Sequence, residues 1–357
     1  MSPSHPERSL AKALVGRSFV HPLFDYVLIG GALSLVVTVA VFTIEPFKNF
    51  GLTNSSSLAT IILLSTSAHF ASSTIRLYTK PGSYQSLPFL TMALPLIAMS
   101  LLPLCIWKAG TLGPHLQSLY LTWSPFHYAA QAYGLSVMYS YRSGCLLAPN
   151  DKRLLWWVAM IPFFYAFISA DGVGIWWITS ALFPSVQDRM APYLHDASYA
   201  LMVTAFLLPI VLYVKVWRSK SGPIPLISLL ILISNGIWWF ALQPYNAFVW
   251  ATVFHGIQYM AIVIIFHLKD QMSRPENRHG KVYHVVWFYL ASLMLGYGLF
   301  IVLPRGYLLA GFGLEESGLI AVAAINIHHF IVDAYIWRLK KGDSNRQVVD
   351  SGVPAPA

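Results

Sequence analysis

The chain has 357 residues, of which 56% are hydrophobic and only 10% are charged, whereas a soluble domain carries about 25% charged residues. A soluble fold would leave much of this apolar surface in water, which excludes an ordinary soluble enzyme or binding domain. The net charge of +9 does not indicate a nucleic-acid partner, because the basic residues lie at the ends of apolar runs rather than in one patch. Two cysteines are too few for a disulfide scaffold or a cysteine metal site.

The chain begins with a polar, basic tail, residues 1–17, which we expect to lie in the cytoplasm. The first apolar run after it is too long for the h-region of a signal peptide, so we predict a retained helix. Apolar runs of ~20 residues then predict an all-α, polytopic membrane helix bundle over residues 18–340 with about ten transmembrane helices. Residues 341–357 are polar, and we expect a disordered cytoplasmic tail. The predicted spans are Leu23–Glu45, Leu58–Tyr78, Pro88–Trp107, His115–Tyr141, Leu154–Ala170, Ala197–Trp217, Pro223–Gln243, Ala247–Leu268, Val285–Leu303 and Gly318–Trp337.

The distribution of positive charge orients these spans. If the N-terminus is cytoplasmic and the spans alternate, all but four of the 23 lysines and arginines fall in cytoplasmic segments. This asymmetry follows the positive-inside rule and places both ends of the chain in the cytoplasm. The segment Gly172–Val186 is apolar but short, and it predicts an interfacial or re-entrant helix. The four basic residues placed outside are Lys48, Lys108, Arg189 and Arg305.

Histidines are unusually frequent inside the predicted spans. They occur on the second, fourth, eighth and tenth spans, which all run from the outside to the inside. At 1.5 Å per residue they fall within about 6 Å of one another along the membrane normal, near the midplane. Polar side chains at this depth are costly and usually face the bundle interior. The histidines concerned are His69, His127, His255, His328 and His329.

The last predicted span combines histidine with an acidic residue. Asn326, His329 and Asp333 form one stripe, whereas His328 points about 100° away from it. Asp333 could serve as a carboxylate ligand of a metal or as an acceptor that holds His329 in one tautomer.

Polar residues also accompany the histidines of the fourth and eighth spans. Gln131 follows His127 at i+4, and Gln258 and Tyr259 follow His255 at i+3 and i+4. A single buried histidine is often no more than an interhelical hydrogen bond. Several imidazoles at one depth on facing helices instead predict a metal or cofactor site.

Four short patches resemble motifs of the bacterial Brp/Blh-type carotene-cleaving membrane dioxygenases, in the same order along the chain. They are His21–Asp25, His69-Phe70, His255–Tyr259 and His328–Asp333. The resemblance implies a non-haem Fe(II) held by histidines from several helices, acting with O₂ on a lipid-soluble polyene. It adds His21 to the candidate ligands and implies a bacterial cytoplasmic membrane.

The leading hypothesis is therefore a membrane-bound non-haem iron oxygenase acting on a carotenoid or another apolar molecule that arrives laterally through the lipid. Tyr259 or Gln258 would orient bound oxygen.

One alternative is a b-type haem protein for electron transfer. The same-helix pairs His115/His127 and His255/His267 are each 12 residues apart, which does not stack two haems but leaves a single bis-histidine haem open. Another is a proton- or metal-coupled transporter. The candidate metal ligands are His69, His127, His255, His328, His329, Asp333 and His21.

Overall fold

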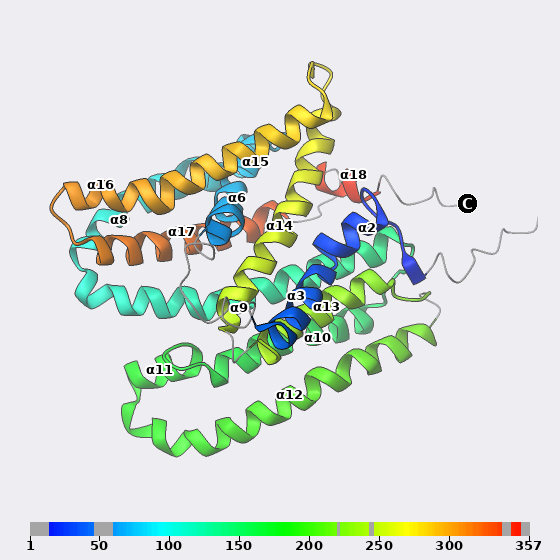
Figure 1. The fold of residues 1–357 in the computed structure, drawn as a ribbon, viewed down its shortest axis with the longest axis horizontal. Helices are drawn as coiled ribbons and strands as arrows, with labels where there is room; N and C mark the ends of the chain where they lie inside the picture. Colours follow the sequence, from blue (N-terminus) through cyan, green and yellow to red (C-terminus); the bar gives the residue numbers. More distant parts are fainter. Residues whose placement is uncertain (1–13, 46–59, 220–221, 243–245, 338–343, 351–357) are drawn as a thin grey trace, which may run out of the picture.

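A computed structural model of the chain is all-helical in the part that it describes, with no strand there (Figure 1). Parts of both predicted tails, residues 1–13 and 351–357, lie outside this part, as do the first residues of the second predicted span and the last residue of the seventh. The described residues are 14–45, 60–219, 222–242, 246–337 and 344–350.

Four short π-helical turns interrupt the α-helices among the described residues. Such turns are rare and often occur at functional sites, and one of them, η2, leads directly into the helix that carries His69. The π turns are η1 (Asp25–Ile29), η2 (Leu63–Ser67), η3 (Phe89–Ala93) and η6 (Gly298–Val302). The longer helices are α3 (Ala32–Thr43), α6 (Ala68–Thr79), α8 (Leu94–Trp107), α9 (Ala109–Arg142), α10 (Pro149–Ser169), α11 (Gly174–Leu182), α12 (Gln187–Trp217), α13 (Leu226–Phe240), α14 (Ala247–Met272), α15 (Lys281–Tyr297) and α17 (Leu314–Ile336). The short ones are α2 (Pro22–Phe24), α7 (Ser83–Ser86), η4 (Pro184–Val186), α16 (Leu303–Leu309) and α18 (Ser344–Asp350).

Six described helical stretches are long and apolar enough to cross a membrane, and a bent pair at residues 22–43 makes seven if it is one span. The structure therefore supports an integral membrane protein but not the full count of ten spans. Helix α13 is too short to cross a membrane, whereas α9 and the helical stretch 60–79, which joins η2 to α6, are long enough but too polar. The six stretches are Phe89–Trp107, Pro149–Leu182, Pro184–Trp217, Ala247–Met272, Lys281–Leu309 and Leu314–Ile336.

The first predicted span is broken in the middle. The segments before and after the break meet at an angle of 54°, and Gly31 at the break has φ of 89°, a conformation that favours glycine. A side chain at Gly31 would also collide with the hydroxyl of Ser234. The freed carbonyl of Ile29 accepts a hydrogen bond of 2.9 Å from Nε2 of Gln258, so α14 stabilises the break.

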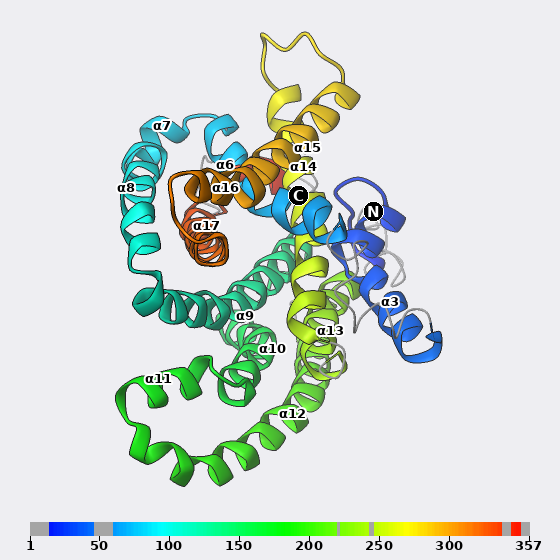
Figure 2. The same cartoon turned by 60° about the vertical axis from the view of Figure 1, so that its left-hand side comes forward.

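Helix α14 runs through the centre of the bundle (Figure 2). It contacts α6 and α15 on one side and α13 and η1 on the other. Two glycines allow the close approach of these elements. A Cβ on Gly256 of α14 would lie 3.3 Å from the carbonyl oxygen of Ser65, and one on Gly296 of α15 would lie 2.6 Å from that of Ser67. The π turn η2 is thus held between two helices immediately before His69.

Helices α11 and α12 lie at one edge of the bundle (Figure 2). The predicted interfacial segment is helix α11 followed by the short η4, between α10 and α12. Most side chains of α12 are exposed, among them Val203, Phe206 and Ile210. A helix that exposes large apolar residues to its surroundings is stable in lipid rather than in water, as expected for a membrane protein.

Part of the C-terminal tail differs from the prediction of disorder, because residues 344–350 form helix α18. Val348 and Val349 are buried in the same core as Phe266. Nη1 of Arg142 donates to the carbonyl of Val349 at 3.1 Å, and Nη2 of Arg76 donates to Oδ1 of Asn345 at 2.9 Å. Polar composition predicts disorder here, but this tertiary packing is not visible in the sequence.

Candidate metal centre

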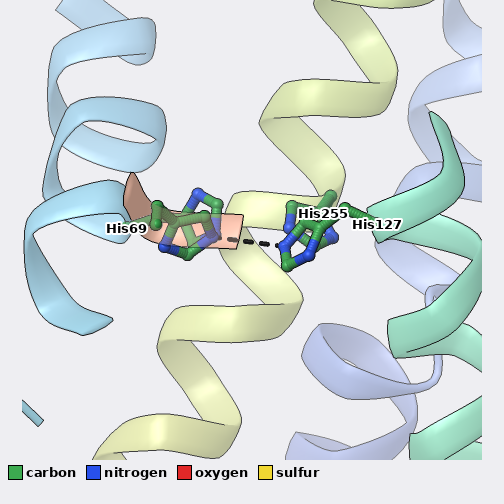
Figure 3. A group of neighbouring side chains, drawn as sticks. His69, His127 and His255 are labelled. Carbon is green, nitrogen blue, oxygen red and sulfur yellow. Dashed lines mark hydrogen bonds between the residues drawn. The ribbon is translucent and has the colours of Figure 1, made fainter. Parts of the chain in front are cut away.

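Four histidines converge in the bundle interior, each from a different helix. They are His69 of α6, His127 of α9, His255 of α14 and His329 of α17, and one ring nitrogen of each lies within 4.8 Å of the others. Figure 3 shows three of these rings pointing toward one another. Four nitrogens at ~2.1 Å from one ion would be about 3–4 Å apart, so only a small contraction would bring all four into contact with a metal ion.

The four imidazoles are enclosed by protein. His69, His255 and His329 have no exposed surface, and His127 is 9% exposed. Neither ring nitrogen of His69 or of His255 has a hydrogen-bond partner in the structure. A buried polar atom without a partner costs about 1–3 kcal/mol, and a cation that binds the lone pair of one nitrogen in each ring would remove part of that cost. The residues therefore fit a bound metal ion.

The tautomer of His329 follows from its neighbours. The hydroxyl of Ser73 donates its single proton to the carbonyl of Phe70 at 3.0 Å. It can therefore only accept from Nδ1 of His329, which lies 2.9 Å away. A neutral His329 with its proton on Nδ1 has a lone pair on Nε2. That nitrogen lies 3.2 Å from Nε2 of His127, inside the four-histidine group.

Asp333 lies beside the four histidines and completes a short chain of polar groups. Its Oδ2 is 3.5 Å from Nε2 of His329 and 3.7 Å from Nε2 of His127. Its Oδ1 accepts a hydrogen bond of 2.6 Å from the hydroxyl of Tyr259, which in turn lies 3.4 Å from Nε1 of Trp337. With the lone pair of His329 on Nε2, the carboxylate is placed where it can contact an ion held between these two nitrogens.

Aromatic rings form the walls of the site. Tyr128 stacks on His255 with ring centroids 4.2 Å apart, and Phe330 packs on His127 at 4.8 Å. Phe70 contacts both His69 and His329, at 4.6 and 5.0 Å. These rings keep water from the imidazoles. Sequence analysis missed their role, although each of the three directly follows a histidine of the group in the chain.

Two predicted ligands lie outside this group. His328 precedes His329 on α17, is only partly buried and does not join the four histidines, because its side chain leaves the helix about 100° away from that of its neighbour. His21 is exposed, and its Nδ1 accepts from the backbone N–H of Leu23 at 3.2 Å.

The His21–Asp25 patch has a structural role in the described structure. Asp25 is fully buried and accepts hydrogen bonds from the backbone N–H groups of Phe19, Val20 and His21. It also accepts one of 2.7 Å from the hydroxyl of Tyr139. Asp25 ties the segment before the helix to its first turn, while His21 is the N-cap of α2 and accepts from the N–H of Leu23. This patch thus fixes the start of the first helical pair.

The two residues predicted to orient oxygen are separated by the structure. Tyr259 contacts His69 with ring centroids 4.6 Å apart and faces the group. Gln258 points instead to the broken first span through its bond to Ile29. Residues that adjoin in a helix face different directions, which explains why only one of them reaches the site.

A mainly apolar pocket of about 380 Å³ adjoins the histidines. It lies between α9 and α17 against α14, and His127, Tyr259 and Asp333 form part of its wall. Most of the remaining lining is apolar or aromatic, including Phe126, Ile262 and Phe330. The candidate metal site therefore has space beside it for an apolar molecule.

Comparison of the chain with protein-family models, with curated proteins and with solved structures gives no significant match. The likeness to the carotene-cleaving dioxygenases thus remains limited to the four short motifs. The structure itself establishes a polytopic helical membrane protein with a buried group of four histidines that could hold a metal ion.

Proposed function

We propose that this chain is a metal-dependent oxidative enzyme of the membrane interior, with a non-haem iron held by His69, His127, His255 and His329. One observation carries the proposal. Four buried imidazoles from four helices approach within 4.8 Å, and two of them have no hydrogen-bond partner for either nitrogen. Such an arrangement is costly for a structural core and suitable for a cation.

The donor set narrows the choice of ion. Neutral imidazoles suit iron, copper, zinc and nickel rather than magnesium or calcium. The motif resemblance favours iron among these. When bound, a redox-active iron would supply the one-electron chemistry that reactions with O₂ require.

The protein would contribute orientation, proton handling and exclusion of water. Ser73 holds the lone pair of His329 toward the other histidines. The Tyr259 hydroxyl donates to Asp333 beside two of the imidazoles, so this pair can hold or release a proton next to the reacting groups. The aromatic rings on the histidines protect the site from bulk water.

A haem is a weaker fit to this geometry. A bis-histidine haem needs two opposed imidazoles with a broad flat space between them. Here any plane between two of the rings would meet the other two, since all four lie around one point. Tyr128 and Phe330 also pack directly on His255 and His127.

The substrate we propose is a lipid-soluble molecule, a carotenoid or another lipid, that enters the pocket between α9 and α17 from the membrane. We also propose ten spans with both termini in the cytoplasm of a bacterial cell. The charge distribution along the sequence supports this orientation. The polar helices α6 and α9 would then span within the bundle, since they carry His69 and His127 toward its interior.

An optical spectrum combined with metal analysis of the purified protein tests the proposal. We expect about one iron per chain and no Soret band. A Soret band would replace the proposal with a haem protein. Protein that binds neither iron nor another transition metal after purification without chelators, and after incubation with Fe(II) under anaerobic conditions, would favour a transport or structural role for the histidines.

A further inference from the structure

The pocket beside the histidines contains a buried amide that the rest of the site does not use. Gln131 lines the pocket on α9, one helical turn from His127. Its Nε2 is buried and has no hydrogen-bond partner. The other polar groups near the histidines are already engaged, because Trp337 donates to Tyr259 and Tyr259 donates to Asp333.

An unpaired amide in an apolar pocket needs an explanation. A buried donor without a partner costs about 1–3 kcal/mol, and sites with such a donor discriminate strongly in favour of ligands that satisfy it. The lining around Gln131 supplies no such partner among the described residues. The missing partner is therefore expected to come from a bound molecule.

The shape of the pocket limits what that molecule is. On α9 the lining extends from Trp123 to Met138, a length of roughly 20 Å along the helix. His127 lies near one end of this stretch, and Gln131 lies ~6 Å further toward Arg142, about halfway along the stretch. An amphiphile in a bilayer is oriented in the same direction as this pocket, because its polar end lies nearer the membrane surface and its apolar part lies nearer the midplane.

We propose that the pocket binds an elongated apolar molecule with one hydrogen-bonding oxygen, a long-chain or isoprenoid alcohol or aldehyde, and that Gln131 binds this oxygen. The inference rests on the proposed function and defines the substrate class of the same site. Gln131 would hold the polar end and place the apolar chain against His127, Tyr259 and Asp333. It is a specificity-determining residue rather than a metal ligand.

Binding of two matched probes tests this assignment. The probes are a dibrominated octadecanol and the dibrominated octadecane that lacks only the hydroxyl. Each is titrated into the full-length protein in dioleoylphosphatidylcholine nanodiscs, with tryptophan quenching by bromine as the signal. Trp123 and Trp337 line the pocket and report binding there. We expect the alcohol to bind about three- to ten-fold more tightly than the hydrocarbon, the effect of one hydrogen bond.

The variant Gln131→Leu should remove this preference by weakening only the alcohol. Gln117→Leu is the matched control, because Gln117 lies on the same helix but does not line the pocket. Unchanged binding of the hydrocarbon shows that Gln131→Leu is folded. The comparison of the two probes in the wild-type protein needs no variant at all.

The outcomes separate this inference from the proposed function. Equal affinities of the two probes in the wild type, or a preference that survives Gln131→Leu, would overturn the role of Gln131. Absence of saturable alcohol binding would also overturn it. Metal content is measured in the same preparations. If protein that contains no metal still prefers the alcohol over the hydrocarbon, the proposed function is refuted but the role of Gln131 in binding is retained.

Discussion

The hydroxyl of Ser73 lies 2.9 Å from Nδ1 of His329 and gives its own proton to the carbonyl of Phe70. A serine on α6 therefore determines which nitrogen of a histidine on α17 is available to a metal. Such a contact behind a ligand fixes both the tautomer and the orientation of the ring.

Replacing Ser73 by alanine should weaken metal binding without unfolding the protein. Loss of a hydrogen bond behind a ligand typically reduces metal affinity about 10–100-fold. Ser72→Ala is the control, because Ser72 is equally buried on α6 but donates only to the carbonyl of His69. Titration of both variants with Fe(II) against a competing chelator measures the effect. Equal affinities of the two variants would show that Ser73 does not control the site.

Substitution of His255 on α14 and of His328 on α17 tests which histidines bind the metal. His255→Ala removes one of the four converging imidazoles, so bound metal should fall to a small fraction of the wild-type content. His328→Ala should leave metal content unchanged, because His328 lies outside the group. Both changes place alanine in an apolar helix, so insertion is expected to survive. The measurement is the metal content per chain in preparations of equal yield. Loss of metal in His328→Ala but not in His255→Ala would show that the metal binds elsewhere.

Much of the candidate site was accessible from the sequence. Histidines at one depth on helices of one direction must lie near one plane, and this argument predicts His69, His127, His255, His328 and His329, of which the structure brings together all but His328. The period of the helix also placed His329, rather than His328, on the stripe with Asp333. The second role of Asp333, as the acceptor of Tyr259, required knowledge of which helices face each other.

Other features could not be read from the sequence. The motif resemblance makes His21 a candidate ligand, but in the structure His21 caps α2 and Asp25 binds the backbone of residues 19–21. The predicted count of ten spans rests on apolar runs, whereas the described helices include only six or seven that are long and apolar enough to cross a membrane, because α13 is short and α9 carries many polar residues. Helix α18 packs against a surface formed by helices distant in the sequence, and local composition does not reveal such a surface.

The close packing at η2 predicts that replacing Gly296 by a larger residue destabilises the protein. Gly296→Ala would place a Cβ 2.6 Å from the backbone oxygen of Ser67, and backbone atoms cannot move aside as a flexible side chain can. We expect a loss of about 1–3 kcal/mol in the free energy of unfolding, as for other overpacked sites. Gly298→Ala is the control, since its Cβ would meet no atom within 4 Å. Thermal melts followed by circular dichroism should rank the two variants. Equal melting temperatures would contradict the packing shown at Ser67.

Topology is tested most cleanly at the two ends of one candidate span. The stretch Lys281–Leu309 is long and apolar enough to cross the membrane, and exposed residues flank it. Arg278 precedes it in a loop that the charge distribution places in the cytoplasm, and Leu309 at its far end is 90% exposed. Single cysteines at these two positions, in a chain with both native cysteines changed to serine, should react with a membrane-impermeant thiol reagent from opposite sides.

In intact cells Leu309→Cys should be labelled and Arg278→Cys should not, whereas inverted membrane vesicles should give the reverse. This direction follows because Arg278 lies among the basic residues that the positive-inside rule retains in the cytoplasm. Labelling of both cysteines from the same side would mean that α15, η6 and α16 form a re-entrant hairpin rather than a span. Opposite sides but inverted order would keep the span and reverse the whole protein in the membrane.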